Sequence, residues 1–246
     1  SVNQLRRRVK WRYGSAFAFC LRVIRVNRAL SMREQPNTIH TAVVLYHFGK
    51  AVNLLDAVRR LCQDGYAREA MTVSRSLFNL YINLKWLTSG QDWKKRIEKF
   101  VDFEVLSKAN YSLDLVRWKK GLTAQEKRKL RQSNRKRIQT VVTKHGLKRN
   151  KYGKYPTWSK SIAEMAIDVD READYRLTYG RLSQTEHTDP RSGREYLSAT
   201  RSGKIVANTG PSEAYTSLVL IDSIRYFLNV KEDAAPILGI STSKAE

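Results

Sequence analysis

The fold is decided by residues 66–90, which read YAREAMTVSRSLFNLYINLKWLTSG. Apolar side chains recur in this stretch at helical spacing and cover almost the whole circumference, and Ser89-Gly90 supplies a stop signal. A helix that is apolar on nearly every side needs other elements around it, because water would otherwise cover its apolar surface. We therefore expect residues 66–88 to be the central helix of a bundle.

Helical patterns fill most of the remaining chain, and its five prolines fall between them. The predicted fold class is all-α: a helical bundle of long antiparallel helices with a basic helical insertion. Asn37 or Thr38 is the expected cap of the second helix, and Thr123 with Glu126 forms a capping box for the basic helix. The further helices are expected at about 3–32, 38–63, 92–118, 124–145, 160–169, 170–187 and 212–228. Residues 188–212 are expected to form a long loop, or a small hairpin at about 195–208.

The sequence predicts three parts. Residues 1–33 are a basic N-terminal helix that packs on the core or extends from it. Residues 34–230 are a single helical-bundle domain with a basic insertion at 117–154, and residues 231–246 are a flexible tail. A chain of 246 residues is long enough to bury one sizeable core.

Charge is concentrated in two segments. The chain has 46 Lys and Arg against 23 Asp and Glu, a formal net charge of +23. Residues 1–33 hold nine basic and no acidic residues, residues 117–154 hold fifteen basic residues and only Glu126, and the rest is neutral overall. Such patches indicate a polyanionic partner, with nucleic acid first and an acidic protein second, although a basic enzyme of another kind is an alternative. The candidate nucleic-acid-binding residues are Lys127, Arg128, Arg131, Arg135, Lys136, Arg137, Lys148 and Arg149.

Cysteine usage and hydropathy exclude several classes of protein. Cys20 and Cys62 stand in apolar helical contexts, which favours buried thiols over a disulfide framework. No Cys/His cluster has zinc-ligand spacing, so neither a metal nor a cofactor is expected. No apolar run approaches the ~20 residues of a membrane span. The N-terminus imitates a signal peptide, but Arg22 and Arg25 interrupt its apolar run, so we expect a cytoplasmic protein without a membrane partner.

Hydroxyl groups and a histidine follow one another at helical spacing in Tyr175-x3-Tyr179-x3-Ser183-x3-His187. Steps of four place these side chains in one slowly drifting stripe of a helix. One interpretation is that His187 is a general acid or base oriented by its hydroxyl neighbours. The alternative is that the tyrosines pack while Ser183 and His187 satisfy hydrogen bonds in the core.

Arg75 is a second candidate because it interrupts the apolar central helix. A buried guanidinium needs a partner, since an unpaired buried charge is costly. A structural ion pair is the commoner outcome. If Arg75 instead faces a cleft, it is suited to hold a phosphate or to stabilise a transition state.

Aromatic residues alternate with basic residues in Lys10-Trp11-Arg12-Tyr13 and in residues 151–155, KYGKY. Such rings can stack on unpaired nucleic-acid bases. The alternative, in which they anchor a helix end or a loop on the core, is equally consistent with the sequence.

The segment 68–87 together with Tyr179, Ser183 and His187 resembles a bacterial all-helical family related to the HEPN (higher eukaryotes and prokaryotes nucleotide-binding) domains. HEPN domains are helical bundles, many are metal-independent ribonucleases, and their signature is an Arg followed after four to six residues by a His. Arg181 and His187 fit this spacing. Two positions depart from the pattern: Leu182 replaces a polar residue, and Asn79 stands where the related family often has Glu.

The resemblance implies a function. His187 would assist the attack of an RNA 2′-hydroxyl on the adjacent phosphate, and Arg181 would stabilise the charge that develops there. Arg75, Tyr175, Tyr179, Asn79 and Ser183 would line the site, RNA is favoured over DNA, and a homodimer is implied. Such an enzyme would suit a toxin or a phage-defence effector. The alternatives are a non-catalytic nucleic-acid-binding module or adaptor that uses residues 117–154, and a subunit that binds an acidic protein.

Overall fold

The structure is a computed structural model that describes residues 2–132, 135–156, 160–180, 182, 196–207 and 210–240. It is all-α apart from one small hairpin, as predicted. The chain forms two compact units, and the 34–230 domain expected from the sequence includes parts of both. One unit joins Ser1–Ser89 to Ile162–Glu246 and is called the bundle; the other is Gly90–Ser161 and is called the basic unit.

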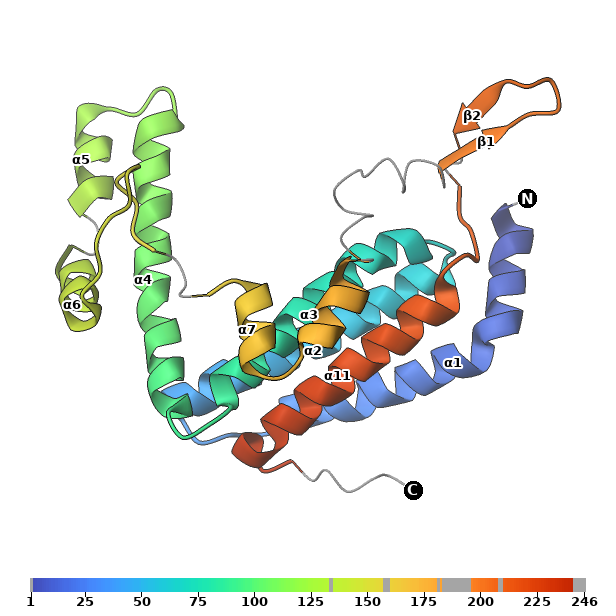
Figure 1. The fold of residues 1–246 in the computed structure, drawn as a ribbon, viewed down its shortest axis with the longest axis horizontal. Helices are drawn as coiled ribbons and strands as arrows, with labels where there is room; N and C mark the ends of the chain where they lie inside the picture. The colour runs from blue at the N-terminus through green and yellow to red at the C-terminus, as the bar shows by residue number, and fades with distance from the viewer. Residues whose placement is uncertain are drawn as a thin grey trace. The chain divides into compact units, whose positions relative to one another are not determined.

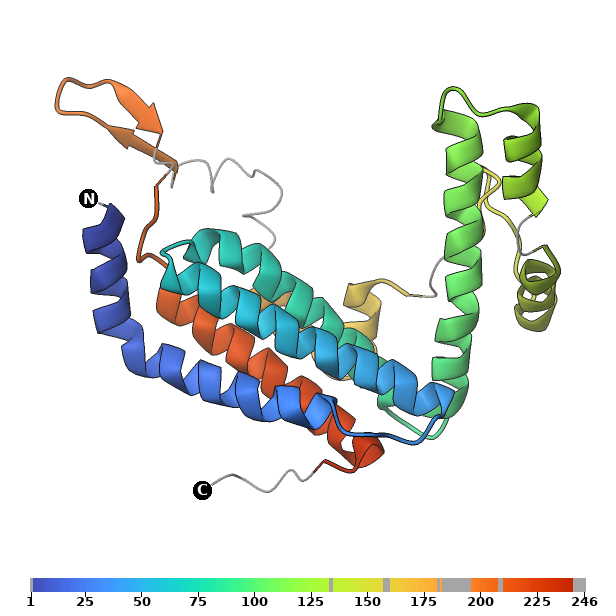
Figure 2. The same ribbon diagram turned by 180° about the vertical axis from the view of Figure 1, so that it is seen from behind.

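Four long helices build the bundle: α1 (Val2–Ser31), α2 (Ile39–Gln63), α3 (Ala67–Thr88) and α11 (Thr216–Leu238). Helices α2, α3 and α11 pack on one another, and α1 covers α2 (Figures 1 and 2). The core forms where their apolar stripes meet, with the buried rings of Phe78, Tyr81 and Tyr226 in mutual contact. Cys20 and Cys62 are buried free thiols, which confirms that prediction. The central helix expected from residues 66–88 is therefore α3.

Local chemistry fixes where α2 begins and where the chain turns into α3. The side chain of Thr38 accepts a hydrogen bond from the backbone N–H of Thr41 over 3.1 Å and so caps α2. Gly65 then takes a left-handed conformation, with φ of 85°. Its carbonyl accepts a hydrogen bond from the N–H of Ser212 over 2.7 Å, which ties the α2–α3 turn to the segment before α11.

Short elements lie along α3. They are α7 (Ile162–Asp168), α8 (Glu172–Asp174) and the π-helix η1 (Tyr175–Tyr179). Trp86 of α3 donates its indole N–H to Asp168 over 2.8 Å, which anchors the end of α7. Strands β1 (Leu197–Ala199) and β2 (Ile205–Ala207) form an antiparallel hairpin with Ser198 opposite Val206, within the predicted range.

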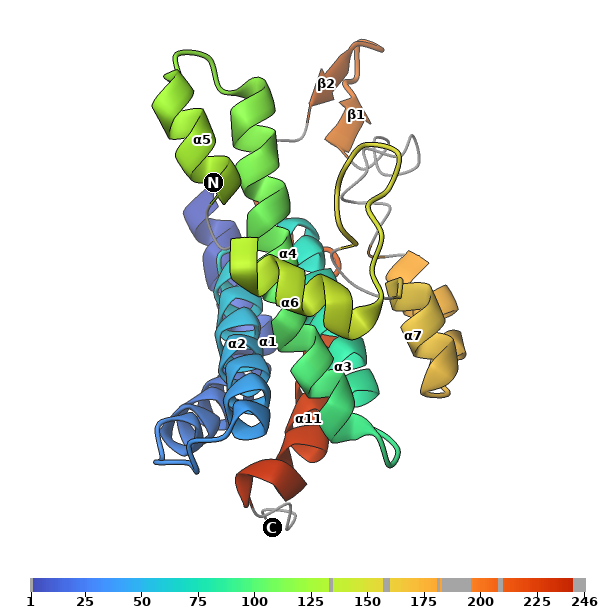
Figure 3. The ribbon, with the colours of Figure 1, turned by 90° about the vertical axis from the view of Figure 1, so that its left-hand side faces the viewer.

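The basic unit contains α4 (Trp93–Trp118), α5 (Ala124–Gln132) and α6 (Arg135–His145), with α5 and α6 both packed on α4 (Figure 3). Its small core joins Phe103, Val105 and Leu106 of α4 to Val141 of α6. The predicted capping box is present: Glu126 accepts from the Thr123 N–H over 2.8 Å, and the Thr123 hydroxyl accepts from the Glu126 N–H over 3.2 Å. The unit therefore has its own core and its own helix-start signal.

Three sequence expectations were wrong. The basic helix expected at 124–145 is described as two helices, α5 and α6, and each of them packs on α4. The last helix runs to Leu238 rather than ending near Leu228, since Val230, Ala234 and Leu238 continue its buried stripe. Pro236 consequently lies inside a helix, and the expected tail from residue 231 begins with two helical turns.

Candidate functional site

A polar stripe runs along the otherwise apolar helix α3. Arg68, Thr72, Arg75 and Asn79 are four, three and four residues apart, so they share one face of the helix. None of them belongs to the buried residues of α3, and all four are partly exposed.

Arg75 meets Tyr179 of η1, although 104 residues separate them in sequence. Nη2 of Arg75 donates a hydrogen bond to the Tyr179 hydroxyl over 2.5 Å, and the guanidinium carbon lies 4.6 Å from the centroid of the tyrosine ring. The Tyr175 ring stacks on Tyr179 at 4.7 Å, and Phe78 lies against it at 5.8 Å. Three residues that the sequence singled out, Arg75, Tyr175 and Tyr179, are thus brought together.

This Arg–Tyr cluster has the chemistry of an anion site. A guanidinium carries five N–H donors and stays charged at physiological pH. Because the Tyr179 hydroxyl accepts the bond from Arg75, its own proton can still be donated to a ligand oxygen. A phosphate held by both groups would receive charge-assisted and neutral hydrogen bonds at once.

Asn79 lies one helical turn beyond Arg75 on the same stripe. Its side-chain oxygen is buried and has no hydrogen-bond partner in the described part of the chain. A buried polar atom without a partner costs free energy, so a ligand donor at this position would recover it.

The helix expected over 170–187 is regular only in part. After the short α8, residues Tyr175–Tyr179 form a π-helix, a rare geometry that occurs frequently at functional sites. Contacts on two sides hold it: Tyr179 on Arg75, and buried Thr178, whose hydroxyl accepts from Arg225 of α11 over 3.5 Å. These tertiary contacts outweigh the preference for an α-helix.

A second polar network, which sequence reasoning missed, fixes η1 and its approach. Arg171 donates to the hydroxyl of Tyr81 over 2.7 Å, and Asp174 lies 3.5 Å from Arg225. Burial raises the pKa of Tyr81, although Arg171 opposes this effect. The sequence feature that could have indicated this network is Arg225, because it interrupts an apolar helix as Arg75 does.

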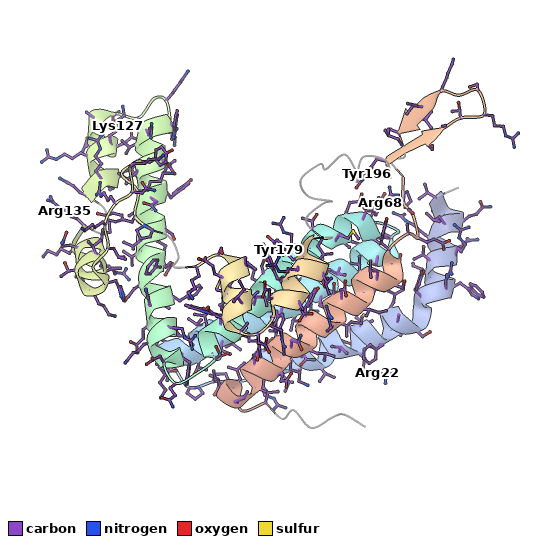
Figure 4. The ribbon with its side chains drawn as sticks, in the orientation of Figure 1. Arg22, Arg68, Lys127, Arg135, Tyr179 and Tyr196 are labelled. Carbon is purple, nitrogen blue, oxygen red and sulfur yellow. The ribbon has the colours of Figure 1, made fainter. Side chains whose placement is uncertain are left out.

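The segment that carries the predicted catalytic residues is tied to the bundle on both sides. Tyr179, which contacts Arg75, comes before it, and Leu182, which lies inside it, is completely buried. After it comes Tyr196, whose ring centroid lies 5.0 Å from the guanidinium carbon of Arg68 (Figure 4). Arg181, Ser183 and His187 lie outside the described residues. The described residues on either side of them, Tyr179 and Tyr196, both contact the polar stripe of α3.

The predicted nucleic-acid-binding residues are distributed over three elements of the basic unit. Lys127, Arg128 and Arg131 lie on α5, three more lie on α6, and two lie in the loop after it; Figure 4 labels Lys127 and Arg135. Seven of the eight are exposed, and Lys127 is partly exposed. The full set is Lys127, Arg128, Arg131, Arg135, Lys136, Arg137, Lys148 and Arg149.

Carboxylates of the basic unit are committed to internal contacts. Asp102 binds Lys144 and His145, each over 2.8 Å, and Asp114 binds Lys154 over 2.9 Å. Glu126 caps α5, and its hydrogen bonds with Thr123 lower its pKa. Within the described ranges, no carboxylate lies within 4.0 Å of the charged groups of the eight candidate cations. The described carboxylates therefore do not neutralise the positive charges of these eight side chains.

The N-terminal charge behaves differently. Arg6 pairs with Asp64, Arg8 and Arg12 pair with Glu213, and Arg28 pairs with Asp56, so much of it serves to attach α1 to the bundle. Arg22 projects from the exposed side of α1 (Figure 4).

The described residues also show whether a metal ion could be held and whether a helix could cross a membrane. No group of three or more His, Cys, Asp or Glu side chains in those residues is arranged to hold a metal ion. Among the helices that the structure describes, none is both long enough and apolar enough to cross a membrane.

Together, the fold and these surfaces define an all-helical bundle protein with an Arg–Tyr cluster on its central helix and a strongly basic second unit. Residues 41–205 match a family of unknown function, DUF5677, and because this is about two thirds of the chain, the protein belongs to that family. The matched range includes α3, the basic unit, η1 and Tyr196. No curated protein and no solved structure matches the chain.

Proposed function

We propose that the protein is a metal-independent RNA endonuclease of HEPN-like type, in which the Arg–Tyr cluster of the bundle binds the phosphate and the basic unit binds the RNA backbone. The observation that carries this proposal is the contact between Arg75 and Tyr179. It places a guanidinium and a phenol at the point where the chain enters the Arg181–His187 segment. The HEPN resemblance, which assigns catalysis to Arg181 and His187, supports the same location.

The reaction is a phosphoryl transfer within the RNA strand. His187 accepts the proton of a 2′-hydroxyl as O2′ forms a bond to the adjacent phosphorus, and the bond from phosphorus to the 5′-oxygen breaks. The leaving oxygen takes up a proton, so the products carry a 2′,3′-cyclic phosphate and a 5′-hydroxyl. Arg75 and Arg181 stabilise the extra negative charge on the phosphorane oxygens.

A test compares variants of the cluster on a labelled RNA in EDTA. Arg75→Ala removes the positively charged guanidinium that would contact the phosphate, and it should lower the cleavage rate about 10²- to 10³-fold. Tyr179→Phe removes one hydroxyl and should lower the rate about tenfold. Arg176→Ala is the matched control, because Arg176 is 73% exposed and pairs with Glu172 instead of contacting α3. Equal rates for all variants would refute the proposal.

A non-catalytic nucleic-acid-binding function is the second candidate. It is favoured by the eight cations of the basic unit, which no described carboxylate neutralises. Binding through phosphates releases counterions, so log K should fall with log salt at a slope of about −0.7 per contact on single strands. Replacing Lys127, Arg128 and Arg131 with Glu should flatten that slope. RNA binding without cleavage would select this function, and binding to an acidic protein alone would select neither.

A further inference from the structure

Three large aromatic rings of the basic unit are exposed to solvent. Tyr111 is 65% exposed, Trp118 is 70% exposed and Tyr152 is 64% exposed. Large aromatic side chains are normally mostly buried, and exposed clusters of them mark interaction sites. We call these three residues the aromatic strip.

Two of the rings belong to one stripe of α4. Tyr111, Asp114 and Trp118 are three and four residues apart, so they follow one another along the same side of the helix. Two turns of helix, about 10 Å, separate Tyr111 from Trp118.

The third ring is placed beside this stripe by a pinned loop. Lys154 binds Asp114 over 2.9 Å, and the backbone of Tyr155 exchanges hydrogen bonds with the side chain of Asn110 over 2.8 and 2.9 Å. The side-chain oxygen of Asn150 accepts from the N–H groups of Tyr152 and Lys154, which closes the loop tip. Tyr152 is therefore held at the tip of a loop that docks on the Tyr111–Trp118 side of α4.

Tyr155 shows what a structural tyrosine in this loop looks like. Its hydroxyl accepts from Arg149 over 2.9 Å, the Arg149 guanidinium covers its ring at 4.6 Å, and it packs against the unit's core. The anchoring role that the sequence left open for the KYGKY stretch belongs to Tyr155. Tyr152 is about two thirds exposed, so it does not anchor the loop on the core in this way.

Cations stand next to the exposed rings. The Arg117 guanidinium carbon is 4.9 Å from the Trp118 ring centroid, and the Lys151 ammonium is 5.1 Å from the Tyr152 centroid. An exposed ring stacks on a base, and a cation beside it binds the phosphate that follows. In a duplex the base faces are already covered by neighbouring bases, so only an unpaired strand offers both.

We propose that the aromatic strip makes the basic unit a reader of unpaired RNA, which binds single-stranded RNA by stacking and discriminates against duplexes. This inference rests on the proposed RNA-binding function and specifies its substrate class. The phosphate contacts of α5 and α6 are common to both forms of RNA, whereas the strip acts on single strands alone.

The test measures binding of the full chain carrying His187→Ala, to prevent cleavage, by fluorescence anisotropy at one fixed salt concentration. The probes are a labelled unstructured RNA and a blunt duplex of the same sequence. Trp118→Ala and Tyr152→Ala should each weaken single-strand binding about 5- to 150-fold and leave duplex binding within about twofold. Trp118→Phe keeps a ring and should retain most of the affinity.

Tyr46→Ala is the matched control, because Tyr46 is 56% exposed on α2 of the bundle and should have no effect on either probe. Equal losses on both probes, or no loss on the single strand, would overturn the inference while the RNA-binding function stands. If the full chain with an unsubstituted aromatic strip binds neither probe, both the inference and the RNA-binding function are overturned. Unchanged circular dichroism and unfolding midpoints show that the variants fold.

Discussion

The guanidinium of Arg75 and the hydroxyl of Tyr179 lie 2.5 Å apart, and they join the central helix to a π-helix 104 residues further along the chain. The hydroxyl and the ring of the tyrosine both face the guanidinium of the arginine. Because a phenol is neutral, its hydrogen bond does not cancel the positive charge of the arginine, and the proposed role of this charge is to act on an anionic ligand.

The two residues should act as a unit. Arg75→Ala and Tyr179→Phe each disrupt the same arrangement, so their effects on the cleavage rate should be non-additive. The double variant should cleave RNA at about the rate of Arg75→Ala alone. Single-turnover rates for the two single variants and the double variant measure this coupling. Independent, multiplicative effects would show that the two groups do not share a ligand.

Gly65 should tolerate no side chain. Its φ is 85°, and a Cβ there would stand 2.7 Å from the Cβ of Pro211, which belongs to a rigid ring. Gly65→Ala should therefore lower the free energy of unfolding by more than about 1 kcal/mol. Gly49→Ala is the matched control, because Gly49 lies inside α2 with nothing within 4 Å of a Cβ, and it should gain up to about 1 kcal/mol. Urea denaturation measures the two free energies of unfolding. A Gly65→Ala variant more stable than Gly49→Ala would contradict the turn geometry described for Gly65.

A buried pair of serines joins α3 to α11. The Ser223 hydroxyl donates to that of Ser74 over 2.9 Å, and both residues are completely buried. Either serine changed to Ala leaves the other hydroxyl unpaired, which should cost about 1–3 kcal/mol. The double Ala variant should recover most of this loss, because no unpaired polar group remains. Chemical unfolding of all four forms provides the measurement, and a double variant as unstable as the sum of the singles would contradict the pairing.

Asp56 should make the free energy of unfolding decrease as the pH falls into the acid range. Burial opposes ionisation, but hydrogen bonds from Arg59, Arg60 and Arg28 outweigh it and lower the pKa of Asp56. A carboxyl whose pKa is lower in the folded state stabilises the fold above its unfolded value, about 3.9, and loses this effect as pH falls through the folded value.

Asp56→Asn should therefore be less stable than the parent by about 2 kcal/mol at pH 7, and the difference should shrink below about pH 4. Glu104→Gln is the control, since Glu104 and its partner Lys108 are both more than half exposed, and it should change stability by less than about 0.5 kcal/mol. A difference for Asp56→Asn that is constant between pH 7 and pH 3 would show that the carboxylate charge has no part in it.

Burial periodicity explains why the long helices were predictable. In α3 the apolar residues recur on nearly every side, and the only arrangement that hides Leu77, Phe78 and Leu84 together is a central helix. The capping box of Thr123 and Glu126 was predictable for a similar reason, because it depends on residues only three apart. Signals of this kind are local in sequence.

Features that depend on distant partners could not be read in this way. The division of the basic segment into α5 and α6 involves the packing of both helices on α4, and the π-helix contacts Arg75 and Arg225. The continuation of α11 through Pro236 depends on burial of Ala235 and Leu238 against the bundle, which outweighs the hydrogen bond lost at proline. For the candidate site, spacing identified Tyr175 and Tyr179, and the interruption of an apolar helix identified Arg75, but only the structure shows that they meet.

The most direct measurement uses a DNA oligonucleotide that contains one ribonucleotide, incubated in EDTA with the unchanged protein or with His187→Ala. Because attack requires a 2′-hydroxyl, the protein should cut only after the ribonucleotide and leave a 2′,3′-cyclic phosphate. His187→Ala should still bind the strand and should cut about 10²- to 10⁴-fold more slowly. Cleavage at deoxyribonucleotides, or an equal rate for His187→Ala, would contradict the proposal that this protein is a HEPN-like ribonuclease.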